Sequence, residues 1–302
     1  MSFTSTVKNE VSMLNTTKAE NITELSALLK NTSTFSSKIK IQTENEAVAK
    51  RILKLLNDLF FINPHIIVRK GYNFNKNYLY IIEINKKVQE IIETLDLNDN
   101  IPKEYIYSDD DLIRAYLRGI FLGVGSINDP KKSRYHLEFM INNIEYTKFL
   151  IELLNKYNLN SKYIRRDNRY MIYIKEAEKI GDFLRIIGAN VSLFYYEDIR
   201  IYRDHKNMTN RLNNCEQANI DKIIETANNQ LKDIEKIEEI GGLDLLDEKT
   251  KQAAIYRKKY PEVSLLELSE IISLETGNSI TKSGLYHRFN KIKKIANKIK
   301  EK

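Results

Sequence analysis

An internal duplication over residues 1–187 constrains the fold of this chain more than any other feature. The predicted order of helix, strand, helix, β-hairpin and helix occurs twice, at an offset of 92 residues between Leu25 and Leu117. A repeat of this length is too long for a solenoid. It fits two α+β half-domains related by a pseudo-twofold axis.

Capping boxes predict where each copy begins. In the first copy, Thr17 and Glu20 open a helix that ends at about Asn31. The elements expected next are a strand over Phe35–Gln42, a helix over 44–60, a hairpin of His65–Lys70 and Tyr78–Ile84 joined through Gly71 to Asn77, and a helix over 86–94. In the second copy, Ser108 and Asp111 open a helix that ends at about Gly123. The elements expected next are a strand over Arg134–Ile141, a helix over 143–157, strands Lys162–Arg166 and Arg169–Ile174 around the turn Asp167-Asn168, and a helix over 176–187.

Small residues recur on one face of the two opening helices. Gly119 and Gly123 are four residues apart, and Ala27 and Asn31 take the same places in the first copy. Small residues at this spacing let two helix backbones approach closely. We therefore expect the two helices to form a spine between the half-domains.

The spine sequences resemble a known motif. Leu117-Arg118-Gly119-Ile120-Phe121-Leu122-Gly123-Val124-Gly125-Ser126 resembles the spine motif of LAGLIDADG homing endonucleases, and Leu25-Ser26-Ala27-Leu28-Leu29-Lys30-Asn31-Thr32-Ser33-Thr34 is similar to a degenerate first copy. The resemblance implies a catalytic metal ligand one place before the final glycine, which is Val124 or Thr32 in this chain. The motif's other acidic place is Leu122 or Lys30. A hard cation such as Mg²⁺ needs carboxylate oxygens, and none of these side chains offers one. We expect no metal, no cofactor and no catalytic residue.

The last 54 residues predict a module of three helices. A capping box of Ser264 and Glu267 opens a helix that a polar break over Ser273–Ser279 ends. Another helix is expected upstream over 247–259, and a third starts near Thr281. The third helix carries an apolar stripe formed by Leu285, Phe289, Ile292, Ala296 and Ile299. This order is that of a helix-turn-helix, although the predicted turn is longer than the usual three or four residues.

The polar face of the third helix is the predicted DNA-reading surface. Its first turns would contact base edges and its later lysines would contact phosphates, as in a recognition helix. The residues expected to bind DNA are Thr281, Lys282, Ser283, Tyr286, His287, Arg288, Asn290, Lys291 and Lys294.

The distribution of charge supports this placement. Residues 249–302 contain 13 Lys and Arg against 5 Asp and Glu, a net of +8. The whole chain contains 48 basic and 41 acidic residues, so 35 and 36 remain for residues 1–248, a net of −1. A chain that is basic at one end usually meets a polyanion there, here double-stranded DNA. The alternative is a basic helical bundle whose lysines are merely solvated.

Two further basic regions have open interpretations. In the stretch 201–220, Arg203 and Arg211 accompany four asparagines, Asn207, Asn210, Asn213 and Asn214. One interpretation is that they contact nucleic acid or fix the angle between the domains. The other is that the asparagines cap two helices, one ending near Arg211 and one over 216–240. The capping interpretation is favoured because asparagine clusters often lie at helix junctions. The predicted hairpins carry Arg69, Lys70, Lys76, Arg165, Arg166 and Arg169. They form a DNA saddle as in homing endonucleases, a solvated face or a protein-binding surface.

The whole chain is similar to the WhiA family of bacterial sporulation and cell-division regulators. The similarity rests on the degenerate spine motifs, on Arg203-Asp204, Asn213-Asn214-Cys215-Glu216 and Ala218-Asn219, and on Thr281-Lys282-Ser283-Gly284 with His287-Arg288. It implies an α+β, pseudo-twofold duplicated LAGLIDADG-like domain of αββαββα type, followed by an all-α helix-turn-helix domain. The expected divisions are 1–190, with halves of about 1–95 and 108–190, a helical linker over 191–246, and a DNA-binding domain over 247–302.

The resemblance implies a DNA-binding regulator without enzymatic activity, linked to cell division, chromosome segregation and sporulation. The duplicated domain would support DNA binding or bind a protein partner. No apolar run is long enough for a membrane span and no signal peptide is evident, so a cytoplasmic, nucleoid-associated protein is expected. The alternative function is a divergent LAGLIDADG-type endonuclease with an unrecognised metal site.

Overall fold

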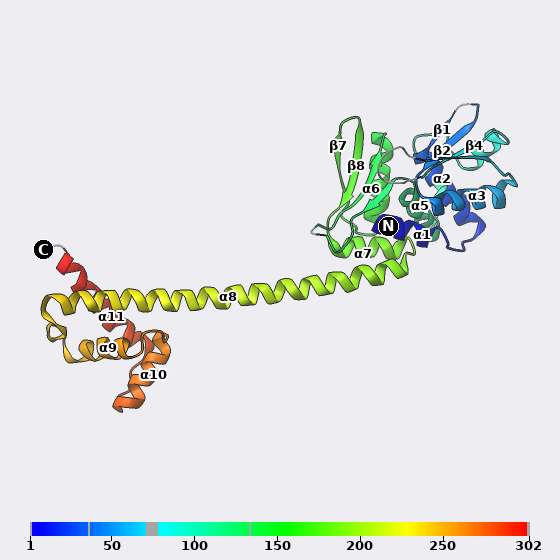
Figure 1. Cartoon of the computed structure of the whole chain (residues 1–302). Coiled ribbons are helices and arrows are strands. Elements are labelled where there is room, and N and C mark those ends of the chain that lie inside the picture. The colour runs from blue at the N-terminus through cyan, green and yellow to red at the C-terminus, as the bar shows by residue number, and fades with distance from the viewer. Residues whose placement is uncertain (1, 36, 71–77, 133, 301–302) are drawn as a thin grey trace. The chain divides into compact units, whose positions relative to one another are not determined.

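The computed structural model describes residues 2–35, 37–70, 78–132 and 134–300. It divides into two compact units, Met1–Arg203 and Asp204–Lys302 (Figure 1). Among the described residues, no helix combines the length and apolar character needed to cross a bilayer.

The first unit contains two copies of one α+β half-domain. The first copy consists of α2 (Lys18–Thr32), β1 (Ser33–Phe35), β2 (Ile39–Thr43), α3 (Glu46–Phe60), β3 (His65–Lys70), β4 (Tyr78–Ile84) and α4 (Val88–Thr94). The second consists of α5 (Asp110–Val124), β5 (Gly125–Ile127), β6 (Leu137–Ile141), α6 (Ile144–Lys156), β7 (Lys162–Arg166), β8 (Arg169–Ile174) and α7 (Ala177–Ile186). The antiparallel sheets have the matching orders β1-β2-β4-β3 and β5-β6-β8-β7. The predicted αββαββα duplication is confirmed.

Several local predictions were wrong. Each sheet has one more strand than predicted. The segment Phe35–Gln42 is not one strand, because β1 ends at Phe35 and pairs antiparallel with β2. The second strand begins at Leu137 instead of Arg134, and β5 is its short partner. Strands of three residues are too short to show a periodicity in sequence.

The ends of the first unit also differ from the prediction. Asp109, and not Ser108, caps α5, and its carboxylate accepts a hydrogen bond from the Leu112 backbone amide. Helix α1 (Phe3–Val11), capped by Ser2, was not predicted, nor was the 3₁₀ turn η1 (Glu104–Ile106). The predicted hairpin turn from Gly71 to Asn77 lies outside the described residues.

The opening helices α2 and α5 form the predicted spine. A Cβ atom on Gly119 would lie 2.2 Å from the backbone oxygen of Glu24 and 2.9 Å from the Ala27 Cβ. A Cβ on Gly123 would lie 3.0 Å from the Thr32 Cγ2 atom. The backbones therefore approach so closely that only glycine fits at position 119, which confirms the prediction of close spine packing.

A buried carboxylate joins the spine to α3. Glu24 is completely buried, and its two oxygens accept hydrogen bonds from Arg51 Nε at 2.7 Å and Arg118 Nε at 2.6 Å. Arg51 also donates to the Leu14 carbonyl oxygen at 2.7 Å. Removing one partner of such a buried ion pair is strongly destabilising, because the charge that remains is buried and uncompensated.

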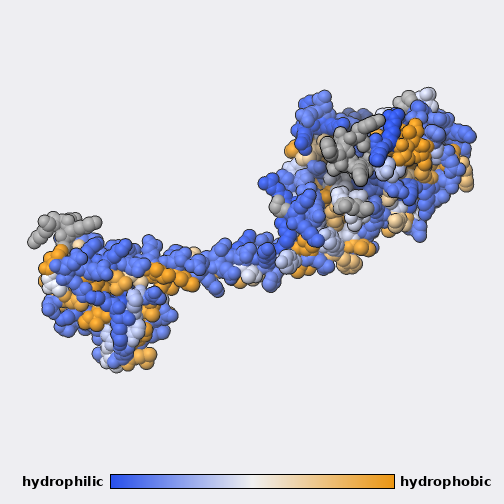
Figure 2. All heavy atoms as spheres, in the orientation of Figure 1, coloured by the Kyte–Doolittle hydropathy of each residue, from blue (hydrophilic) through white to orange (hydrophobic). Residues whose placement is uncertain are grey.

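Helix α8 (Asn190–Gly241) runs unbroken for 52 residues and belongs to both units. At its start, the Glu10 carboxylate accepts the backbone amides of Val191 at 2.7 Å and Ser192 at 2.9 Å. Hydrophilic residues predominate on the side of α8 seen in Figure 2.

The predicted junction near Arg211, with a new helix over 216–240, was wrong. Asn207, Asn210, Asn213 and Asn214 lie within α8 and are exposed. Neither Gly nor Pro interrupts residues 190–240, and each asparagine costs only roughly 0.7 kcal/mol relative to alanine in a helix interior.

The second unit combines the end of α8 with η2 (Leu243–Leu245), α9 (Glu248–Lys259), α10 (Leu265–Thr276) and α11 (Lys282–Lys300). Its core joins Ile234 and Ile237 of α8 to residues of the three later helices, namely Ala253, Ala254, Leu268, Ile272, Leu285, Phe289, Ile292 and Ala296. The last turns of α8 therefore fold with the helices that follow.

The spine packing generates a test. We expect Gly119→Ala to destabilise the first unit by about 2 kcal/mol or more, because the added methyl group forces the α2 and α5 backbones apart. Gly181→Ala in α7 is the matched control, since its Cβ would meet the end of the Glu197 side chain, which can move, and would otherwise make an ordinary contact with Leu193 Cδ1 at 3.7 Å. Alanine there is expected to be neutral or stabilising by ~0.5–1 kcal/mol. Urea unfolding followed by circular dichroism measures both, and equal stabilities would contradict close spine packing.

Candidate nucleic-acid interface

The turn between α10 and α11 is shorter than predicted. The Ser264–Glu267 capping box is confirmed, with the Glu267 carboxylate 2.8 Å from the Ser264 amide nitrogen. The predicted end at Ser273 was wrong, because α10 continues to Thr276 and ends at Gly277, whose φ is 71°. The Ser273 hydroxyl stays inside the helix, donating to the Ser269 carbonyl and accepting the Ile280 amide. Five residues, 277–281, therefore separate the two helices.

The apolar stripe of α11 faces the core of the second unit. Leu285, Phe289, Ile292 and Ala296 are all buried, as predicted, whereas the side chain of Ile299 lies outside the described residues. Burial of this stripe determines which face of α11 is presented to solvent.

Arg257 of α9 is buried, although it belongs to the basic last turn of the helix with Lys258 and Lys259. Its guanidinium lies 5.6 Å from the Phe289 ring centroid and donates to the Val263 carbonyl at 2.7 Å and to Gln230 Oε1 at 3.0 Å. Burial lowers the pKa of Arg257 to about 10. This side chain connects α8, α9 and α11, so it is a structural residue that pattern analysis missed.

Most predicted DNA-binding side chains lie on the opposite, solvent-facing side. Asn290 is partly exposed, and the Tyr286 and His287 rings lie 6.0 Å apart. The exposed residues are Thr281, Lys282, Ser283, Tyr286, His287, Lys291 and Lys294. The Thr281 hydroxyl accepts the Gly284 amide at 3.1 Å and so begins the helix. The first two turns of α11 thus present hydroxyl, imidazole and phenol groups together, followed by a lysine.

Two of the predicted DNA-binding residues contact α9 within the same unit. Arg288 donates to the Lys249 carbonyl at 3.1 Å and to Gln252 Oε1 at 3.2 Å. Lys291 forms an ion pair with Asp247, the residue that caps α9. The hydrogen bond from Lys291 is the main reason that the pKa of Asp247 falls to about 2. Their partners are distant in sequence, so local patterns could not reveal these contacts.

The two β-hairpins of the first unit carry the other basic group. Arg69, Lys70, Arg165, Arg166 and Arg169 are exposed at their ends, and Lys76 lies outside the described residues. The same strands also expose apolar side chains, among them Val68 and Ile164.

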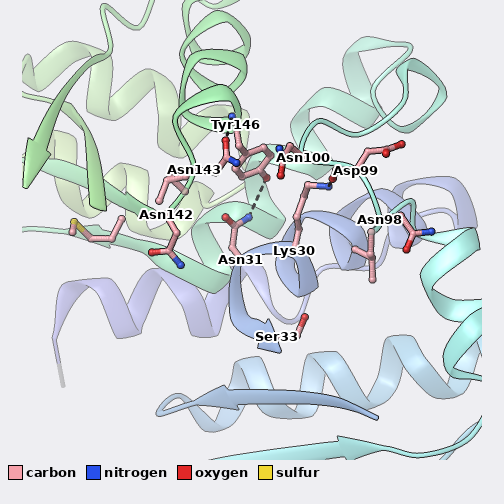
Figure 3. Close-up of a pocket in the computed structure, with 12 residues that line it drawn as sticks. Lys30, Asn31, Ser33, Asn98, Asp99, Asn100, Asn142, Asn143 and Tyr146 are labelled. Carbon is pink, nitrogen blue, oxygen red and sulfur yellow. Dashed lines mark hydrogen bonds between the residues drawn. The ribbon is translucent and has the colours of Figure 1, made fainter. Parts of the chain in front are cut away.

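The end of the spine holds no carboxylate at the motif positions. The Thr32 hydroxyl donates to the Leu28 carbonyl at 2.8 Å, and Val124 packs against the core. Lys30 donates to the Asp99 carbonyl oxygen at 2.5 Å, and burial is the main cause of its lowered pKa (Figure 3). Among the described residues, no group of three or more His, Cys, Asp and Glu side chains is arranged to hold a metal ion.

Arg203 is held within the first unit. Its guanidinium donates to the carbonyl oxygens of Pro130 at 2.8 Å and Lys132 at 2.6 Å, and lies 4.6 Å from the Tyr135 ring centroid. These contacts join the start of α8 to the loop after β5.

Comparison with known proteins matches three consecutive segments of the chain. Residues 18–98 match the WhiA N-terminal LAGLIDADG-like domain, 113–206 the WhiA LAGLIDADG-like domain, and 209–296 the WhiA C-terminal HTH domain. Curated proteins named "Probable cell division protein WhiA" are similar over their full length. The protein from Clostridium botulinum (strain Hall) is 43% identical over 100% of this chain and 99% of its own, and that from Enterococcus faecalis is 41% identical with the same coverage.

A solved structure agrees with these matches. The crystal structure of full-length DUF199/WhiA from Thermatoga maritima has a TM-score of 0.59 and 26% identity, and 99% of each chain is covered. Sequence, domain order and fold therefore agree, and the chain belongs to the WhiA family.

Proposed function

We propose that this protein is a non-enzymatic, sequence-specific DNA-binding regulator that acts in cell division. The observation that carries the proposal is the polar face of α11, where Ser283 and His287 are exposed on a helix whose opposite face is buried. The match to an HTH domain and the cell-division name of the relatives support it. Roles in transcription, chromosome segregation and sporulation, and a place beside the nucleoid in the cytoplasm, belong to the same proposal.

The geometry suits different parts of α11 to different contacts with DNA. Short polar side chains on its first turns suit hydrogen bonds to base edges in the major groove. Lys294, for which the described residues provide no ion-pair partner, suits a phosphate. Arg288 and Lys291 hold α11 against α9. We therefore propose that their main role is to position the helix, and that contact with DNA is secondary.

The endonuclease alternative has less support. Hydrolysis of a phosphodiester by a metal-dependent nuclease needs carboxylates that hold the cation and activate water. The motif positions hold Thr32 and Val124 instead. We propose that the duplicated domain supports DNA binding or binds a protein partner, and the mixture of exposed basic and apolar residues on its hairpins suits either role.

Salt dependence separates phosphate contacts from positioning contacts. We expect Lys294→Ala to weaken binding to all duplexes and to reduce the slope of log K against log salt by about one unit. Lys291→Ala should change the slope less, because its amine is already paired with Asp247. Lys251→Ala in α9 is the control, since it breaks an ion pair with Asp244 of η2. Fluorescence anisotropy over a salt series measures the slopes, and identical slopes for all variants would exclude a phosphate contact at Lys294.

Preference for a particular sequence tests the reading surface. His287→Ala and Ser283→Ala are expected to lower the preference for the specific site over random DNA by ~1–3 kcal/mol for each good base contact. Binding to random DNA should change little, because these side chains carry no fixed positive charge. The specific site is first identified by selection from genomic fragments. If both variants weaken specific and random binding equally, α11 is not the reading element.

Metal dependence tests the absence of catalysis. We expect millimolar Mg²⁺ or Mn²⁺ neither to raise the melting temperature, as binding to a native site would, nor to cause nicking of plasmid DNA. The double variant Thr32→Asp, Val124→Asp should be less stable without metal, because two carboxylates would share a partly buried site. Magnesium-dependent nicking by the unmodified protein would reverse the assignment.

A further inference from the structure

A cavity of about 390 Å³ lies in the second unit beside the start of α10. Its wall combines residues of α8 and α9, the loop before α10, and the first residues of α10 and α11. These residues are Lys222, Ile223, Thr226, Arg257, Val263, Ser264, Leu265, Leu266 and Lys282. We call this cavity the Arg257 pocket. Its volume lies within the range of small-molecule sites, which is roughly 300–1,000 Å³.

The lining of the Arg257 pocket combines an apolar surface with a single sign of charge. Its apolar side chains are Ile223, Val263, Leu265 and Leu266. Its charged side chains are Lys222, Arg257 and Lys282, and none of the described residues that line it is acidic. A cavity of this kind suits a ligand that joins an apolar body to an anionic group.

Arg257 is the buried member of the charged group, with only 1% of the residue exposed. Its Nε atom donates to Gln230 Oε1 at 3.0 Å, and its Nη1 atom donates to the carbonyl oxygens of Val263 at 2.7 Å and Tyr260 at 3.3 Å. A guanidinium has five N–H groups, so the two on Nη2 remain. They have no acceptor among the described residues. Nη2 is therefore the donor available to a ligand in the cavity.

Arg257 carries a charge that no described carboxylate compensates. In the same helical turn, Lys258 and Lys259 form ion pairs with Glu238 and Glu275. The acceptors of Arg257 are all neutral, and burial alone moves its pKa, which is lowered. A buried cation without a carboxylate is destabilising, so an anion in the cavity would stabilise this unit.

A carboxylate on an apolar body is the ligand group that matches both parts of the lining. Charge-assisted hydrogen bonds from a guanidinium to a carboxylate are roughly twice as strong as those between neutral groups. Lys222 and Lys282 are exposed, have no ion-pair partner among the described residues, and add positive potential at the cavity. A phosphate ion would also meet the charge, but it would leave the apolar wall without a partner.

We propose that the Arg257 pocket binds a small carboxylic acid with an apolar body, whose carboxylate accepts from Arg257 while its hydrocarbon part packs against Leu265 and Leu266. Lys282 belongs both to this lining and to the predicted DNA-binding residues. A bound acid would therefore lower the positive potential at the start of α11 and weaken DNA binding. This consequence rests on the proposed function, whereas binding of the acid does not.

Isothermal titration calorimetry of the full-length protein, without DNA, tests the binding. The probes are three acids with different apolar bodies, namely octanoate, phenylacetate and indoleacetate, together with inorganic phosphate. We expect one molecule of at least one acid to bind per chain. The neutral amide of that acid is the control for apolar contact alone. It should bind at least about tenfold more weakly, because it lacks the charge that pairs with the guanidinium.

Two exposed leucines of α10 provide a matched pair of variants that leave Arg257 in place. Leu266 is 51% exposed and lines the pocket, whereas Leu274 is 84% exposed and lies outside the lining. Leu266→Asp adds a carboxylate to the wall and should weaken binding of the acid at least about tenfold, by repulsion and by competition for Arg257. Leu274→Asp should leave the affinity unchanged. Circular dichroism checks that both variants keep the helical fold.

Several results would overturn the proposal. They are failure of all three acids to bind at millimolar concentration, equal affinity for the acid and its amide, equal weakening in the two variants, and binding of phosphate as tight as that of the acid. Displacement of the acid by a short DNA duplex whose own binding is lost in Leu266→Asp alone would assign the pocket to backbone phosphate instead. A failure of DNA binding through α11 would leave the calorimetry of the acids unaffected.

Discussion

The close contact between α2 and α5 is the constraint on which the rest of the first unit depends. Gly119 lies so near the Glu24 backbone that the two helices cannot separate or rotate without losing their common core. Each helix leads directly into the first strand of its sheet, so the spine also determines where the two sheets begin. The close packing of the two helices therefore holds the duplicated halves against each other.

The Glu24 carboxylate adds a polar constraint to this apolar contact. It is buried between Arg51 of α3 and Arg118 of α5 and accepts a hydrogen bond from each. These bonds are directional, whereas apolar contacts alone would not fix the orientation of the helices. Removing one partner of such a group typically costs about 3–5 kcal/mol, because a buried charge remains. The triad thus favours one arrangement of three helices over other compact arrangements.

Duplication has left two similar places at the end of the spine with different chemistry. Beside the end of α2, the wall of a cavity includes Lys30, whose amine donates to backbone carbonyl oxygens. Beside the end of α5, the wall of another includes residues of α1, a helix that precedes the repeat. The two equivalent places are therefore lined by different segments of the chain.

In the second unit, some of the cationic side chains are buried or paired within the protein, and others are exposed. Arg257 is buried against Phe289, while Arg288 and Lys291 connect α11 to α9. The total positive charge of this segment is thus larger than the charge available to a ligand. Net charge in sequence indicates the kind of partner, whereas packing selects which cations can reach it.

Patterns within about one helical turn were sufficient to predict much of this protein. The capping boxes at Thr17 and Ser264, the stripe from Leu285 to Ala296 and the spacing of Gly119 and Gly123 all depend on neighbours in sequence, and each is present in the structure. Other features depend on partners far apart in sequence. The short strands β1 and β5 exist because of the strands that pair with them. The burial of Arg257 and the Lys291–Asp247 pair were likewise decided by tertiary packing, since a side chain's partners and its access to water arise only once distant segments meet.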